Sequence, residues 1–188
     1  MASRAVPAPL AHLPNALTIL RLALIPVFAA TYIVADDGSS WAAGLIFGAA
    51  GVTDQVDGFL ARRWRVESRF GTLADPLADR LMIDTAVILL WVEDKLPWYG
   101  AAVILLRDVL LVGGYRLLVP HGYELSVSKL GKLATWLLYL SVGILTVVGH
   151  ATDWPRWLFW IALALALVAA AQYVVGARRE VARGGMAQ

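Results

Sequence analysis

The chain has 188 residues, a formal net charge of +2 and a mean hydropathy of +0.68, and 60% of its residues are hydrophobic. Such a hydropathy excludes an ordinary soluble domain and makes an integral membrane protein the expected class. The sequence contains no cysteine, which excludes a disulfide framework and a thiolate metal site.

Six apolar stretches, each close to the length of about 20 residues that crosses a bilayer, predict six transmembrane helices. In chain order we expect them at residues 16–34, 41–61, 75–92, 98–119, 128–148 and 155–175. The whole chain, 1–188, is then one all-α membrane domain with a tail at 1–13 and a basic tail at 177–188.

The first predicted helix carries a polar stripe in an otherwise apolar run. Asn15, Thr18 and Arg21 are three residues apart and therefore share one side of the helix. Pro26 is expected to kink this helix, whereas Pro76 is expected in the first turn of the third. Five tryptophans fall near predicted helix ends, where they suit the membrane interface: Trp41, Trp91, Trp98, Trp154 and Trp157.

Lysine and arginine are divided unevenly between the two sides of this arrangement. One side holds both termini and the loops at 62–74 and 120–128, and its basic residues are Arg4, Arg62, Arg63, Arg65, Arg69, Arg116, Lys129, Lys132, Arg178, Arg179 and Arg183. The other side has only Lys95 and Arg156. Because basic loops stay in the cytoplasm, the arginine-rich side is predicted to face it.

Four aspartates stand close together where the second predicted helix ends and the third begins. Asp54 and Asp57 are three residues apart and Asp75 and Asp79 are four apart, so each pair lies on one face of its helix. Four unpaired carboxylates at a membrane face would repel one another, and a hard cation such as Mg²⁺, Mn²⁺ or Ca²⁺ relieves that repulsion. Asp84, about one turn further on, either joins this cluster or pairs with an arginine.

Arginines and glycines between the two aspartate pairs suit a phosphate-bearing substrate. Gly58 and Gly71 let a ligand approach the backbone. Phosphate oxygens can be bound by the arginines that follow the first pair, Arg62, Arg63, Arg65 and Arg69. Arginines at a helix end also often serve only to solvate it. With a metal ion, the whole set indicates phosphoryl-type transfer, in which one carboxylate acts as general base on an acceptor hydroxyl.

The order and spacing of these residues resemble the signature of the CDP-alcohol phosphotransferase family. In this chain it reads Asp54-x-x-Asp57-Gly58-x-x-Ala61-Arg62, eight further residues, then Gly71-x-x-x-Asp75-x-x-x-Asp79. The match has eight fixed positions over 26 residues, and the six-helix pattern extends the resemblance over essentially the whole chain.

This resemblance implies that the phosphatidyl group of CDP-diacylglycerol is transferred to an alcohol and that CMP is released. Asp54, Asp57 and Asp75 would ligate metal, and Asp79 would both reach a second Mg²⁺ or Mn²⁺ ion and deprotonate the acceptor. The donor nucleotide would lie against Gly58, Ala61, Arg62 and Gly71. The active site would open to the cytoplasm at the ends of the second and third helices. A homodimer in the bacterial cytoplasmic membrane is expected, with no nucleic-acid partner.

The acceptor is expected to be chosen outside the signature. Arg107 in the fourth helix, with Lys129 and Lys132 at the start of the fifth, are the candidates for binding an acceptor phosphate. Arg107 and Asp108 are adjacent, so we expect their side chains to diverge and to find separate partners. The chain resembles the cardiolipin synthase and phosphatidylglycerophosphate synthase branch. The Arg-Asp pair and Ala134, where a second lysine is typical of the glycerophosphate enzymes, favour phosphatidylglycerol over glycerol 3-phosphate.

Two other classes of protein remain open. Acidic residues in membrane helices also build divalent-cation transporters, but these are expected to hold their carboxylates near the midplane of the membrane, on discontinuous helices in paired halves. A nonenzymatic lipid-binding scaffold would not need four aspartates.

Overall fold

The computed structural model describes residues 13–35, 38–64, 69–118, 129–150 and 152–184. Within these ranges the chain is all-α and forms six helices: α2 (Leu13–Ile33), α3 (Trp41–Trp64), α4 (Arg69–Val92), α5 (Trp98–Leu118), α6 (Lys129–Val147) and α7 (Trp154–Gly184).

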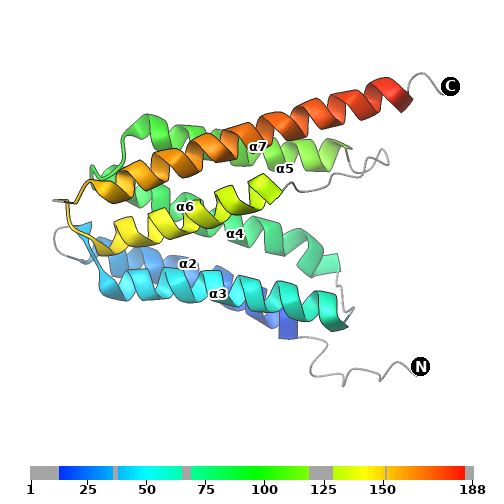
Figure 1. Ribbon diagram of the computed structural model, residues 1–188. Helices are drawn as coiled ribbons and strands as arrows, with labels where there is room; N and C mark the ends of the chain where they lie inside the picture. The colour runs from blue at the N-terminus through cyan, green and yellow to red at the C-terminus, as the bar shows by residue number, and fades with distance from the viewer. Residues whose placement is uncertain (1–12, 36–37, 65–68, 119–128, 151, 185–188) are drawn as a thin grey trace.

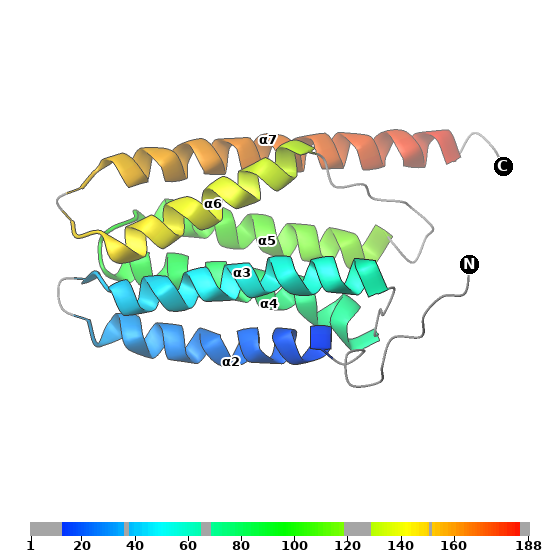
Figure 2. The same cartoon turned by 60° about the horizontal axis from the view of Figure 1, so that its bottom comes forward.

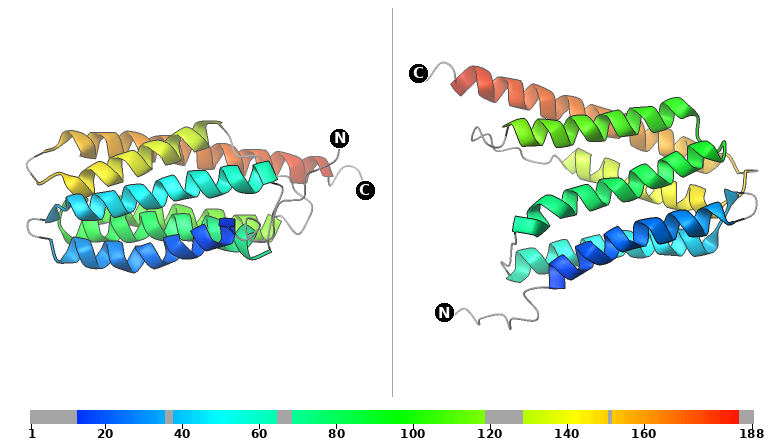
Figure 3. Two further views of the ribbon diagram at one scale, coloured as in Figure 1. Left: turned by 90° about the horizontal axis from the view of Figure 1, so that it is seen from below. Right: turned by 180° about the vertical axis from the view of Figure 1, so that it is seen from behind.

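The helices run up and down, so that their ends gather at two opposite ends of the bundle (Figure 1). One end, which we call the connection end, holds the short links α2–α3, α4–α5 and α6–α7. The other, the open end, holds the start of α2, the end of α3 and the start of α4. Helices α2, α3 and α4 pack together, and α6 lies along α7 and against α3 (Figure 2). The helix ends converge at the connection end and spread apart at the open end (Figure 3).

The expected helices are all present, but several of their bounds differ, and α2 begins at Leu13 rather than at residue 16. The loop predicted at 62–74 is shorter, because α3 continues to Trp64 and α4 begins at Arg69. Pro76 is therefore the eighth residue of α4 rather than part of its first turn, a position that membrane helices tolerate. Helix α7 continues to Gly184 through part of the predicted tail, where Arg, Glu and Ala favour a helix.

The membrane character of the chain is supported by three helices. Stretches long and apolar enough to cross a bilayer are found among the described residues at Ala16–Ile33, Lys129–Val147 and Trp154–Gly176. Helix α3 adds a shorter apolar segment, Trp41–Thr53, before its aspartates begin. Large apolar side chains face outward, including Leu45 and Val109, each 69% exposed. Six membrane crossings remain a prediction, because α3, α4 and α5 also carry charged residues.

The predicted tryptophan belt is found at the connection end. All five tryptophans are exposed and lie on the helix turns next to the short links: Trp41, Trp91, Trp98, Trp154 and Trp157. This placement suits a membrane interface at that end.

Helices α3 and α6 pack closely through small residues. Gly44 lies against Val147, Gly143 lies against the ring of Phe47, and the Ser40 amide donates to the Thr146 carbonyl at 2.9 Å. Phe47 in turn packs against Phe28 of α2, with the two rings tilted by 47° and their centroids 5.7 Å apart. Glycine allows this approach because it has no Cβ, as is common between membrane helices.

Lys95 ties the α4–α5 link to the end of α6. Asp94, at φ 55°, ends α4 in the left-handed conformation, and the Lys95 amide donates to the Leu90 carbonyl at 2.9 Å. The Lys95 side chain is buried, and its Nζ donates to the carbonyls of Leu145, at 2.8 Å, and Val148. Helix carbonyls at this position lack intrahelical donors and attract a cation. Burial lowers the pKa of Lys95 to about 8.

Gly44→Ala is expected to destabilise the protein, because a Cβ at this position would lie 2.2 Å from Val147 Cγ2. Overpacking of this kind costs about 1–3 kcal/mol. Gly48 is a matched control one turn later, since no atom lies within 4 Å of its added Cβ. Gly48→Ala should leave the Tm of the purified protein unchanged or raise it. A wild-type Tm for Gly44→Ala, or no recovery in Gly44→Ala/Val147→Ala, would contradict the close approach.

Candidate active site

The four aspartates occupy two neighbouring helices at the open end of the bundle. Asp54 and Asp57 belong to α3, and Asp75 and Asp79 belong to α4, which packs against α3. At 1.5 Å per residue, Asp54 and Asp79 each lie about 15 Å along the helix from the α3–α4 link. Asp57 and Asp75 each lie about 10 Å from it. The two helices therefore pair the four positions level by level.

The predicted donor residues lie on the same two helix ends. Gly58, Ala61 and Arg62 follow Asp57 on α3, and Gly71 is in the first turn of α4. The side chains of these residues and of the four aspartates are outside the described part of the structure. Among the side chains that are described, no three His, Asp or Glu residues come together. The metal, donor and base roles therefore stay predictions, supported by the placement of the backbone.

Helix α2 carries a buried arginine, Arg21, that was not among the predicted site residues. Thr18 and Arg21 are both fully buried, so the predicted polar stripe faces the interior of the bundle. Arg21 lies about 12 Å from the start of α2, at a depth similar to that of the aspartates, and α2 packs against both α3 and α4. An arginine inside an apolar stretch of sequence is the signal that indicates a functional residue in a membrane helix.

Arg107, one of the predicted acceptor residues, is part of a partly buried charge cluster between α4 and α5. This cluster, which we call the α4–α5 charge cluster, consists of Arg80, Asp84, Arg107 and Asp108. Asp108 Oδ1 accepts a hydrogen bond from Arg107 Nη1 at 3.0 Å and a second from Arg80 Nη1. The prediction that Arg107 and Asp108 diverge to separate partners is therefore wrong, because the long arginine side chain folds back to its neighbour.

Two polar atoms of this cluster are buried and make no hydrogen bond with the described residues. They are Nε of Arg107, a donor, and Oδ1 of Asp84, an acceptor. Asp84 is within electrostatic range of Arg80, Arg107 and Asp108, so it belongs to this cluster. Arg80 directly follows Asp79 in α4, which links the cluster to the predicted catalytic position.

The two predicted acceptor lysines lie apart from this cluster, in the first turn of α6. Lys129 and Lys132 are both exposed, and neither forms an ion pair within the described part of the chain. Two cations at the positive end of a helix repel its dipole, so an anion there would stabilise them.

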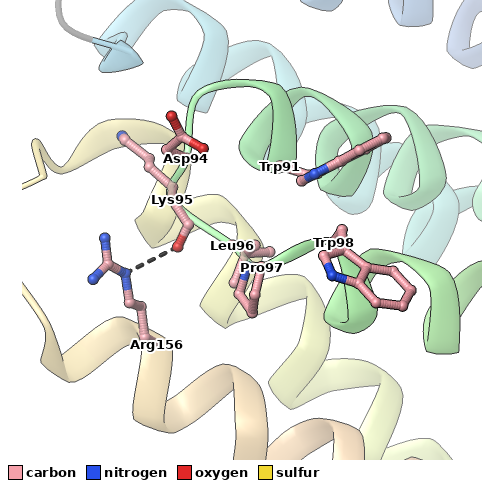
Figure 4. Close-up of a pocket in the computed structure, with 7 residues that line it drawn as sticks. All are labelled: Trp91, Asp94, Lys95, Leu96, Pro97, Trp98 and Arg156. Atoms are coloured by element: carbon pink, nitrogen blue, oxygen red, sulfur yellow. Dashed lines mark hydrogen bonds between the residues drawn. The ribbon is translucent and has the colours of Figure 1, made fainter.

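A cavity of about 320 Å³ opens at the connection end, at the opposite end of the bundle from the aspartates. Its walls include Trp91, Trp98 and Arg156, and Arg156 Nε donates to the Lys95 carbonyl at 2.9 Å (Figure 4). This cavity is therefore not part of the candidate active site.

Comparison with known protein families supports the signature. The model of the family described as CDP-alcohol phosphatidyltransferase matches residues 11–168 of this chain. The chain belongs to the CDP-alcohol phosphatidyltransferase family. It is therefore an enzyme, a transferase of phospholipid biosynthesis.

Relatives within the CDP-alcohol phosphatidyltransferases extend over almost the whole chain. Proteins from Shigella flexneri serotype 5b (strain 8401) and Escherichia coli (strain K12) are each 34% identical over 182 residues, covering 90% of this chain and 96% of the relative. Both are named CDP-diacylglycerol–glycerol-3-phosphate 3-phosphatidyltransferase. Their names do not support the expectation that phosphatidylglycerol is the acceptor, and they point to glycerol 3-phosphate.

Proposed function

We propose that this enzyme transfers the phosphatidyl group of CDP-diacylglycerol to the hydroxyl of glycerol 3-phosphate and releases CMP. The observation that carries the proposal is the complete signature, with its four aspartates on two adjoining helix ends at matching depths. Similarity to enzymes named for this donor and this acceptor, over nearly the full length of each chain, supports it.

The aspartate positions fit a pair of hard divalent cations. Their donor set is all oxygen, which suits Mg²⁺ or Mn²⁺. Asp54, Asp57 and Asp75 would hold one ion, and Asp79 would contribute to a second. The ions would offset the negative charge of the donor diphosphate and of the departing CMP.

The residues of the chain would then divide the reaction between them. Gly58, Ala61 and Gly71 would leave room for the cytidine nucleotide, and Arg62 would bind the diphosphate. Asp79 takes the proton of the acceptor hydroxyl as its oxygen bonds to the phosphorus that carries diacylglycerol. The bond from this phosphorus to the CMP oxygen breaks, and CMP leaves with the electron pair.

Arg107, midway along α5, would hold the acceptor phosphate, and Lys129 and Lys132 in the first turn of α6 would attract it at the open end, which we assign to the cytoplasm. This orientation rests on the excess of lysine and arginine at that end. We propose further that the enzyme lies in the bacterial cytoplasmic membrane and that, as the family resemblance implies, it forms a homodimer. Continuous helices through Asp54, Asp57, Asp75 and Asp79 argue against a transporter, which would break its helices at the ion site.

Phosphatidylglycerol is the second candidate acceptor. It is favoured by Asp108 after Arg107 and by Ala134, a buried alanine where the glycerophosphate enzymes typically have a second lysine. Loss of that cation weakens the case for a small, doubly charged acceptor.

Asp79→Asn is expected to reduce CMP release by about 100- to 10,000-fold, because the amide cannot accept the proton or neutralise a metal ion. Asp94→Asn is the control: Asp94 is exposed at the connection end, and asparagine tolerates its positive φ. Excess chelator should abolish turnover of the wild type, and Mg²⁺ or Mn²⁺ should restore it. CMP release that survives Asp79→Asn or chelation would refute the mechanism.

The acceptor is tested by supplying labelled CDP-diacylglycerol to the purified enzyme with glycerol 3-phosphate, phosphatidylglycerol or inositol phosphate in parallel. We expect phosphatidylglycerophosphate from the first reaction. Cardiolipin from the second reaction alone would establish the second candidate. No product from any of the three would overturn the proposed function.

A further inference from the structure

We propose that Asp108 is a positioning residue, which holds the Arg107 guanidinium in place for the phosphate of the acceptor. The inference rests on the proposed function, in which Arg107 binds that phosphate. It concerns a carboxylate outside the family signature that lies next to neither aspartate pair in the sequence.

The geometry of Asp108 suits a support rather than a substrate contact. Asp108 is 3% exposed, and its Oδ1 accepts hydrogen bonds from both Arg80 and Arg107. A carboxylate in direct contact with an acceptor phosphate would repel it. Bonded to two arginines, the same carboxylate fixes their planes and offsets part of their charge.

Arg107 keeps capacity for a further partner. Its Nη1 is committed to Asp108, whereas its buried Nε makes no hydrogen bond within the described residues. An unsatisfied buried donor costs free energy, so a phosphate oxygen that accepts from this side would stabilise the site. Without Asp108, the Arg107 side chain would be free to turn toward the carboxylate of Asp84, which interacts with it electrostatically.

The position of Arg80 extends this support to the reacting end. Arg80 directly follows Asp79 on α4, and its bond to Asp108 on α5 spans the two helices. Asp108 thus connects the residue after the predicted base with the residue predicted to hold the acceptor. A misplacement of about 1 Å at such a contact can cost about 100-fold in rate.

Asp108→Asn is the test, because it keeps the shape of the side chain and removes its charge. The full-length enzyme is assayed for the KM of glycerol 3-phosphate, or of phosphatidylglycerol if the wild type uses that acceptor, and for the KM of CDP-diacylglycerol. We expect the acceptor KM to rise about 10- to 100-fold and the donor KM to stay within about twofold. Asp108→Glu, which restores the charge, should recover part of the loss.

Two further variants keep the test decisive. Arg80→Gln/Asp108→Asn removes one charge of each sign, so the net charge of the α4–α5 charge cluster does not change. This double variant can therefore be assayed if Asp108→Asn alone does not fold. The same rise in acceptor KM is expected. Asp153→Asn is the matched control, since Asp153 also accepts from an arginine, Arg156, at 2.9 Å but is exposed at the connection end. It should change neither KM by more than about twofold.

The outcomes separate this inference from the proposed function. A wild type that uses neither acceptor overturns the proposed function and the inference with it. An active wild type whose acceptor KM is unchanged in the Asp108 variants overturns the inference alone. Equal changes in both KM values, together with a lower Tm, would show that Asp108 only stabilises the fold and would also overturn it.

Discussion

Electrostatic repulsion among four carboxylates is the constraint on which this structure depends. Charges are costly within a membrane, and like charges on adjoining helices raise that cost. The antiparallel packing of α3 on α4 brings Asp54 level with Asp79 and Asp57 level with Asp75. Cations would offset this repulsion, and we propose that divalent metal ions supply them. A phosphate-bearing donor would then share the coordination of these ions.

The helix ends are held together at the connection end and are further apart at the open end. At the connection end, Lys95 binds the last carbonyls of α6, and Arg156 binds the carbonyl of Lys95. Gly44 allows α3 and α6 to approach closely near the same end. The helices spread towards the opposite end (Figure 3). The helix bounds place the four aspartates and the lysines of α6 towards that end. The contacts at the connection end therefore lie far from the end at which we propose that the substrates enter.

The local sequence pattern predicted the six helices. It did not predict the contact between Arg80 and Asp108 on neighbouring helices. The apolar stretches located all six helices, and the spacing of Thr18 and Arg21 predicted that they share one side of their helix, a side that the structure buries at both residues. Pro76 was misplaced because proline is expected in a first turn, although membrane helices accept it in the interior. The bond between Arg80 and Asp108 joins residues 28 positions apart, which no local periodicity reveals. The acceptor was hardest to predict, because it depends on a few residues outside the signature.

A titration with Mn²⁺ shows whether the paired aspartates hold divalent ions. Purified enzyme is titrated with Mn²⁺, and the electron paramagnetic resonance signal of free Mn²⁺ is measured before and after CMP is added. We expect about two bound ions per chain in the wild type. Asp57→Asn/Asp75→Asn, which removes one ligand from each helix, should lose them. Equal Mn²⁺ binding by this variant and the wild type would contradict the account.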